Sequence, residues 1–132
     1  MNTLGKVLVE PLNFGFLLLE NFTLISLSSA IEPLRLANHS LKKNIYNWHT
    51  FSEQDGSVLA SDGVSINVDF SINSEAALSD IDLLIVCGGI DVEKNYSKNI
   101  ARFLRNVHNK KNALGAICTD SRILAMADLL NG

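Results

Sequence analysis

Runs of apolar residues alternate with amphipathic stretches along this chain. Residues 14–19 form a short continuous apolar run, and residues 81–86 and 114–117 form two more. Such runs are typical of strands that are buried on both faces. Residues 24–38 and 99–109 instead place apolar side chains at helical spacing, and in the first of these stretches we expect one apolar side made of Leu24, Leu27, Ile31, Leu34 and Leu36. Strands that alternate with helices predict an α/β fold with a parallel sheet, and we expect the three apolar strands at its centre.

The segments between these elements carry shorter signals. Residues 46–52 alternate between apolar and polar positions, which predicts a further strand. Residues 58–68 predict one or two short strands around a turn, and residues 74–78 predict a short helix capped by Ser74. Pro33 lies inside the first predicted helix, so we expect it either to kink that helix or to mark its first turn.

Cys118 carries the most chemical information. It follows the apolar run at 114–117, and a polar stretch and then an amphipathic helix follow it. A nucleophilic side chain at the joint between a buried strand and a helix has the layout of a nucleophile elbow. The helix N-terminus would favour the thiolate there. The alternative is a small buried residue that closes the strand, since free cysteines are often buried.

A glycine pair follows the strand at 81–86. Gly88 and Gly89 allow a sharp turn that points backbone N–H groups into a cleft, so opposite a nucleophile they could form an oxyanion hole. The alternative is a plain turn at a strand end. Ligands of parallel sheets bind at the carboxyl ends of the strands. Because the glycine pair and Cys118 both fall at such ends, the sequence predicts that they share one site.

Other polar and aromatic residues have mainly structural interpretations. Cys87 lies within an apolar strand and is expected in the core. Glu32 is either on a solvated helix face or a partner for Arg35. Tyr46 and Trp48 share a strand face, either as a wall for a cationic ligand or as sheet packing, of which we favour packing. The histidines are scattered, and no spacing indicates a metal site.

Composition narrows the function classes. The chain has 132 residues, a formal net charge of −3 and 47% hydrophobic residues, as expected for one globular domain. Without a basic run, a nucleic-acid-binding surface on this chain is not expected. The two cysteines do not suggest a disulfide framework, so a cytoplasmic location is expected. Neither a secretory signal nor an apolar stretch of membrane-spanning length is apparent.

Taken together, the motifs resemble a known family. The motifs are the segments at 15–22 and 30–38, the Gly-Gly strand at 84–92 and the Gly-Ala-Ile-Cys-Thr elbow at 115–119. They are similar to the ThiJ/PfpI (DJ-1/PfpI-like) superfamily. More narrowly, they resemble the amidase-like N-terminal sensor domain of AraC-family transcriptional regulators, especially regulators of carnitine and glycine betaine catabolism. The resemblance implies a flavodoxin-like three-layer sandwich of the class I glutamine-amidotransferase type.

The sequence departs from the enzymes of this superfamily in three ways. Ser26 stands where those enzymes usually carry an acidic residue that hydrogen-bonds the elbow cysteine. Asp120 stands where a small residue is usual, and its charge disfavours a nearby thiolate. The chain also stops just after the elbow helix. We therefore expect a leader at 1–13 and a partial domain at 14–132, without the later strands and the helix-turn-helix domain.

The resemblance implies a ligand-sensing domain rather than an enzyme. The effector would be a small metabolite, a quaternary ammonium or amino-acid-like compound, and no cofactor or metal is expected. DNA would be bound only through the absent C-terminal domain, the full-length protein would be a homodimer, and no membrane would be involved. The alternative is a cysteine-dependent hydrolase, amidase or glyoxalase-like enzyme with Cys118 as nucleophile. The expected ligand-binding residues are Cys118, Thr119, Gly88, Gly89, Ser26 and Asp120.

Overall fold

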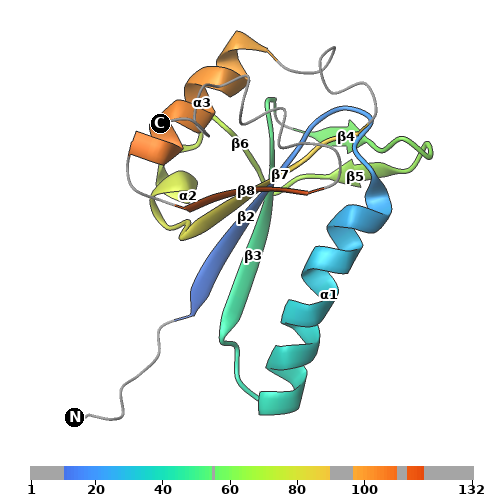
Figure 1. The fold of residues 1–132 in the computed structure, drawn as a ribbon, viewed down its shortest axis with the longest axis vertical. Helices are drawn as coiled ribbons and strands as arrows, with labels where there is room; N and C mark the ends of the chain where they lie inside the picture. Colours follow the sequence, from blue (N-terminus) through green and yellow to red (C-terminus); the bar gives the residue numbers. More distant parts are fainter. Residues whose placement is uncertain (1–10, 55, 90–96, 110–112, 118–132) are drawn as a thin grey trace.

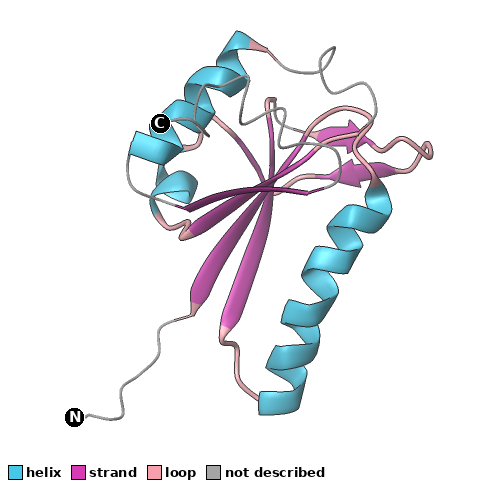
Figure 2. Cartoon of the chain, in the orientation of Figure 1, coloured by secondary structure: helices cyan, strands magenta, loops and turns pink. Residues whose placement is uncertain are grey.

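A computed structural model gives the structure of this chain and describes residues 11–54, 56–89, 97–109 and 113–117, of which 108–109 and 113–117 are described by their backbone. Strands and helices alternate along most of this part of the chain (Figure 2). In chain order the elements are β2 (Leu12–Leu18), α1 (Leu24–Leu41), β3 (Tyr46–Ser52), β4 (Ser57–Leu59), β5 (Ser65–Asn67), β6 (Phe70–Ser71), α2 (Glu75–Ser79), β7 (Leu83–Cys87), α3 (Lys98–Asn109) and β8 (Ala113–Ile117).

The main sheet has five strands in the order β6-β3-β2-β7-β8, and every pair of neighbours is parallel. In its centre, Phe16 of β2 lies opposite Thr50 of β3 and Ile85 of β7. The parallel α/β sheet predicted from the apolar runs is therefore confirmed. The third apolar strand, β8, lies at one edge of the described sheet rather than at its centre.

Helices cover both faces of the sheet and make three layers (Figure 1). Side chains alternate along β2 and into the residue that follows it: Phe16 and Leu18 pack with the cluster on the α1 face, and Leu17 and Leu19 pack with the cluster on the α3 face. All four are at most 2% exposed. Full burial of such a side chain contributes about 1.5–3 kcal/mol. This two-sided burial explains why the sequence of β2 is continuously apolar rather than alternating.

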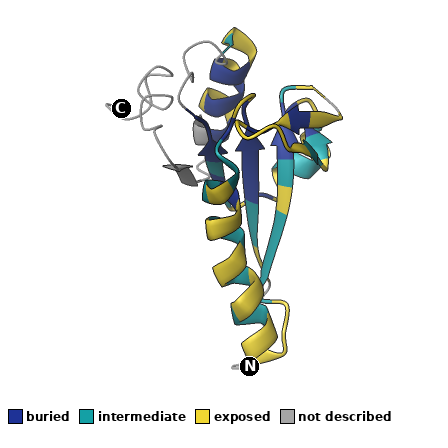
Figure 3. Ribbon diagram, turned by 90° about the vertical axis from the view of Figure 1, so that its right-hand side faces the viewer, coloured by how far each residue is buried: buried dark blue, intermediate teal, exposed yellow. Residues whose placement is uncertain are grey.

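The α1 helix is the longest in the described part of the chain and is exposed along much of its outer face (Figure 3). Leu27 is buried against the sheet, and Leu34 packs partly against the same cluster. Leu36 was expected on this apolar side, but it is 51% exposed. Residues two apart in a helix point in nearly opposite directions, so Leu34 and Leu36 cannot share a face. Pro33 lies inside the helix and does not mark its first turn.

The end of α1 lies three residues beyond the expected position at Asn38, at Leu41. Lys42 then adopts the left-handed conformation with a φ of 55°. The Asn38 side chain ties this end to β3, because its Oδ1 accepts hydrogen bonds from the N–H groups of Ile45 (2.9 Å) and Tyr46 (3.0 Å). These hydrogen bonds explain why Asn38, a residue type that is common in turns, lies within the helix.

The segments between β3 and β7 follow the sequence prediction closely. β4 and β5 form an antiparallel hairpin, in which the Asp62 carboxylate accepts a hydrogen bond from the Val64 N–H (3.1 Å). Ser74 occupies the N-cap position of α2, as expected, but its side chain makes no capping hydrogen bond. The Ser74 N–H instead donates to the Ser71 carbonyl at 3.1 Å. Among the described helices, none combines the length and the apolar character that crossing a membrane requires.

Candidate functional site

The order of the strands places a topological switch point between β2 and β7. From β2 the chain passes through α1 to β3 on one side, and from β7 it passes through α3 to β8 on the other side. These two strands are hydrogen-bonded neighbours, with Leu18 opposite Cys87. In open parallel sheets, ligands bind at the carboxyl ends of strands where the connections diverge in this way. The β2–α1 loop and the Gly88–Gly89 turn both lie at this point.

Backbone hydrogen bonds hold the β2–α1 loop against the end of β7. The Leu19 N–H donates to the Cys87 carbonyl, and the Thr23 N–H donates to the Gly88 carbonyl, both at 3.1 Å. Between these two bonds the chain turns at Asn21, which has a φ of 64°. Asparagine is one of the few non-glycine residues that adopt this left-handed conformation readily. The start of α1 is therefore fixed beside the glycine turn.

Gly89 is required by the close approach of this loop. A Cβ at position 89 would lie 2.2 Å from the carbonyl oxygen of Asn21 and 3.6 Å from the Cα of Phe22. No side chain fits at that distance from a backbone atom. Of the two interpretations left open by the sequence, a plain turn and an oxyanion hole, neither anticipates this packing. The close packing against Asn21 gives Gly89 a structural role under either interpretation.

Ser26 lies in the first turn of α1. Its backbone N–H donates to the Thr23 carbonyl (3.1 Å), and Thr23 in turn bonds to Gly88. The structure therefore brings Ser26, Gly88 and Gly89 to the same end of the sheet, as the sequence predicts. The first turn of α1 contains no acidic residue. The partial positive charge of this helix N-terminus thus has no carboxylate within the turn to balance it.

Cys118, Thr119 and Asp120 lie outside the described residues, so their predicted places in this site stay predictions. β8 ends at Ile117, which lies opposite Cys87 in the sheet. The described strand thus brings the chain to the carboxyl edge next to the glycine turn, one residue before Cys118. The prediction that the sulfur of Cys118 faces the glycine turn rests on this direction of the chain and on the elbow pattern.

The β4–β5 hairpin also contributes to this end of the sheet, which the sequence pattern did not reveal. The Asn21 N–H donates to the Leu59 carbonyl (2.8 Å), and the Ser61 N–H donates to the Phe22 carbonyl (2.8 Å). Phe22 is fully buried beneath this contact. The signal that could have indicated the loop is the polar pair that interrupts the apolar run at residues 20–21. The β4–β5 hairpin that contacts this loop lies far along the sequence, so no local sequence pattern could indicate the contact.

A hollow of about 290 Å³ opens at the carboxyl ends of β2 and β3. Glu53 is held at its rim, because its Oε2 accepts a hydrogen bond from the Ser97 hydroxyl (2.9 Å). The Ser97 hydroxyl oxygen also accepts a bond from the Ile100 N–H (3.1 Å) and so caps the start of α3. Sequence reasoning did not single out Glu53. The hollow is lined by Leu18, Leu19, Glu20, Ser52, Glu53, Gln54, Ser57, Val58 and Ile100.

The remaining candidates have the structural roles that the sequence favoured. Cys87 is fully buried in the core. Glu32 pairs with Arg35 at 2.6 Å, and this hydrogen bond lowers the pKa of the Glu32 carboxyl below its ordinary value. Tyr46 packs edge-to-face on Phe14, which confirms the packing interpretation. A metal-binding group of His, Cys, Asp and Glu side chains is absent from the described part of the chain.

Comparisons with known proteins agree with this fold. The model of the DJ-1/PfpI family matches residues 16–132. The HTH-type transcriptional regulator GbdR of Pseudomonas aeruginosa is 44% identical over 93% of this chain, and the HTH-type transcriptional regulator CdhR of the same species is 38% identical over 91%. The chain spans 33% and 34% of the lengths of these two relatives.

Among solved structures, an AraC family transcriptional regulator from Pseudomonas putida superposes with a TM-score of 0.81 and 30% identity. The match covers 91% of this chain and 63% of that one. These comparisons confirm the flavodoxin-like fold and the resemblance to DJ-1/PfpI-type domains of AraC-family regulators. Since the family model matches most of the residues and the fold agrees, this chain belongs to the DJ-1/PfpI family.

Proposed function

We propose that this chain is the ligand-sensing domain of an AraC-family transcriptional regulator, with a small metabolite bound near Cys118. The observation that carries the proposal is the meeting of the Gly88–Gly89 turn and the start of α1 at the switch point between β2 and β7. It lies where parallel sheets bind ligands, and the first turn of α1 contains no acidic residue. The similarity to transcriptional regulators over more than nine-tenths of this chain supports the regulatory role.

The chemistry at this end of the sheet suits a metabolite that carries a carboxylate. Backbone N–H groups at the start of α1 and the positive end of its dipole attract an anion, and Ser26 adds a hydroxyl to the same turn. Among the expected effectors, amino acids and quaternary ammonium compounds such as glycine betaine and carnitine have a carboxylate for this end of the site. In the proposal, Asp120 would meet the cationic group of that effector, and Thr119 and Cys118 would complete the wall.

A cysteine hydrolase, amidase or glyoxalase-like enzyme is the second candidate, because β8 ends one residue before Cys118 and next to the glycine turn. Nucleophilic cysteines need an activating partner. The position from which the family's enzymes supply a carboxylic acid holds Ser26 in this chain. Asp120 adds a negative charge two residues from the sulfur, which raises the cost of forming a thiolate. We therefore favour sensing over catalysis.

The proposed DNA binding, oligomeric state, location and domain bounds follow from the regulatory role. DNA recognition would belong to a C-terminal helix-turn-helix domain outside this sequence, and the full-length regulator would be a cytoplasmic homodimer. Residues 1–13 would be a leader and residues 14–132 part of the sensor domain. The helix-turn-helix assignment is supported by the names of the relatives, of which this chain spans about a third.

Calorimetric titration tests the proposal directly. Glycine betaine, carnitine and a set of amino acids would be titrated into the chain, with Ser26→Ala as the site variant. Ser28→Ala is the matched control, because its hydroxyl bonds only locally to the Ile25 carbonyl. We expect one of these compounds to bind, Ser26→Ala to weaken the binding, and Ser28→Ala to leave it unchanged.

The same compounds and generic ester and dicarbonyl substrates would be assayed for turnover by the wild-type chain and by Cys118→Ser. Turnover that Cys118→Ser abolishes would replace the sensor with the enzyme. Absence of binding by every compound would argue against this class of effector, and equal effects of the two serine variants would argue against the site.

A further inference from the structure

A groove runs between α2 and α3, on the face of the sheet opposite α1. It has a volume of about 220 Å³. Its floor is apolar, because Ile72 and Phe103 are buried and Leu78 is half-buried. None of the residues of the proposed effector site lines it. Its full lining is Ile72, Asn73, Glu75, Leu78, Asn99, Arg102, Phe103, Asn106 and Val107.

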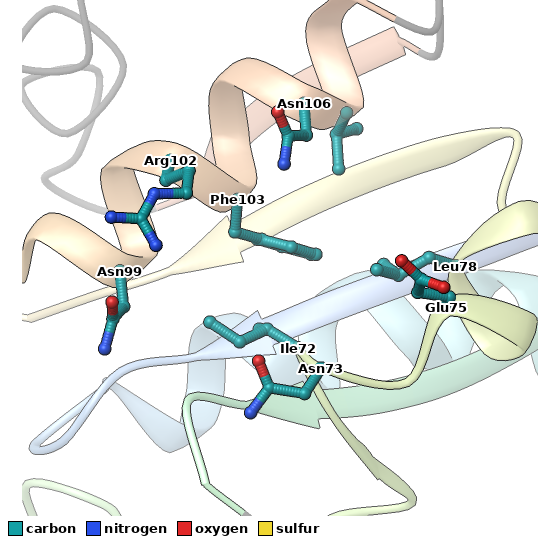
Figure 4. Close-up of a pocket in the computed structure, with 9 residues that line it drawn as sticks. Ile72, Asn73, Glu75, Leu78, Asn99, Arg102, Phe103 and Asn106 are labelled. Carbon is teal, nitrogen blue, oxygen red and sulfur yellow. The ribbon is translucent and has the colours of Figure 1, made fainter.

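The groove carries one exposed charge of each sign. Arg102 comes from α3 and Glu75 from α2, and they lie toward opposite ends of the groove with Phe103 between them (Figure 4). Within the described residues, neither side chain forms an ion pair. Where the chain places the same two residue types together, as at Glu32 and Arg35, they pair at 2.6 Å. Arg102 and Glu75 are thus spaced apart along the groove instead of neutralising each other.

Asparagine side chains also line the groove. Asn106 points from α3 toward Phe103, and Asn73 lies on the opposite wall (Figure 4). A third, Asn99, is steadied by a hydrogen bond of 3.4 Å from its Nδ2 to the Glu53 carboxylate. Each amide side chain offers both donors and an acceptor. Amides in this position match the alternating N–H and C=O groups of a peptide.

We propose that this groove binds a short peptide with free termini. The C-terminal carboxylate would pair with Arg102, whose guanidinium suits bidentate binding of a carboxylate. The N-terminal ammonium would pair with Glu75, and an apolar side chain would lie on Phe103. A peptide with free termini carries one charge of each sign, as the groove does. The volume equals about seven water molecules at ~30 Å³ each, which fits two or three small residues.

NMR titration of the chain with tri-alanine tests this proposal. The N-acetylated tripeptide lacks the ammonium, the C-terminal amide lacks the carboxylate, and free alanine is too short to reach both ends. Arg102→Gln and Glu75→Gln remove the two charges of the groove. Arg105→Gln is the matched control, since Arg105 is exposed on the same helix and does not line the groove. These positions are on the surface, so the variants should fold.

We expect tri-alanine to shift the amide signals of α2 and α3 and to bind more tightly than the three analogues. Arg102→Gln should weaken tri-alanine roughly tenfold, as expected for loss of a charged hydrogen bond. It should leave the C-terminal amide unaffected, and Glu75→Gln should likewise spare the N-acetylated tripeptide. Lack of binding up to roughly 10 mM, or equal losses in Arg102→Gln and Arg105→Gln, would overturn the proposal. The effector site plays no part in these outcomes.

Discussion

Replacing Gly89 by alanine tests the packing that shapes the proposed effector site. The added Cβ would lie 2.2 Å from the Asn21 carbonyl oxygen. Close carbon–oxygen contacts in proteins lie at about 3.3 Å, so one of the two segments must move by about 1 Å. The φ of Gly89 is not in the positive range. The cost of the substitution is therefore steric rather than conformational.

The backbone near Gly89 cannot move without disturbing its neighbours. The Asn21 N–H bonds to Leu59 at 2.8 Å, and the Thr23 N–H bonds to Gly88 at 3.1 Å. Each such bond contributes about 1 kcal/mol net. Overpacking of a well-packed site costs about 1–3 kcal/mol. Together these magnitudes predict that Gly89→Ala lowers the free energy of unfolding by about 2–4 kcal/mol.

Gly15→Ala is the matched control, because it adds the same methyl group in β2. The nearest atom there is Cδ1 of Ile81 at 2.6 Å, the end of a side chain that can rotate. We expect a loss of about 1 kcal/mol. Urea unfolding followed by Trp48 fluorescence measures both variants, and the midpoint for Gly89→Ala should fall by at least about 1 M. A Gly89→Ala chain as stable as Gly15→Ala would refute the close approach of the two loops.

Further predictions concern the core, the surface ion pair and the chemistry. Leu104→Ala should lower the free energy of unfolding by about 2–5 kcal/mol in urea, because Leu104 is fully buried, whereas Leu36→Ala should cost less than about 1 kcal/mol. The pKa of Glu32 is lowered by its bond to Arg35, so the stabilisation from the pair is present above the unfolded pKa of about 4.5 and is lost as the pH falls through the folded value. Denaturant midpoints of the wild type and Glu32→Gln should therefore converge in acid, and a difference that grows there would contradict the assignment. Hydrolysis of generic esters and amides by the wild type should equal that by Cys118→Ser, and a higher rate for the wild type would contradict the sensor role. Fluorescence anisotropy should detect no salt-sensitive binding of duplex DNA by this chain, whose net charge is −3, and sub-micromolar binding would contradict that expectation.

The fold was largely predictable because burial on both faces leaves a direct mark on the sequence. The continuous apolar character of β2 and β7 reflects layers on both sides of the sheet, and this pattern predicts parallel strands. The sequence prediction was wrong in finer details, at single residues of the helices and their caps. Leu36 was assigned to the wrong face because apolar residues two apart were grouped together. Ser74 occupies its predicted N-cap position, but its side chain makes no capping bond.

The candidate site was predictable only in part. The strand ends placed Gly88 at one end of the sheet, the family resemblance implied that Ser26 lies there too, and backbone hydrogen bonds connect the two residues through Thr23. The reason for Gly89 could not be predicted, since it depends on a carbonyl group far away in the sequence. The proposed peptide groove could not be predicted either, because Glu75 and Arg102 come from separate helices and share no sequence motif.

Mapping the effector on the chain tests the central claim most directly. Amide NMR spectra would be recorded during titration with whichever metabolite binds in calorimetry. The account predicts that the largest shifts fall on Thr23, Ser26, Gly88 and Gly89, at the carboxyl ends of β2 and β7, and that the metabolite remains chemically unchanged. Shifts confined to other parts of the chain, or conversion of the metabolite during the titration, would contradict a sensor site at this end of the sheet.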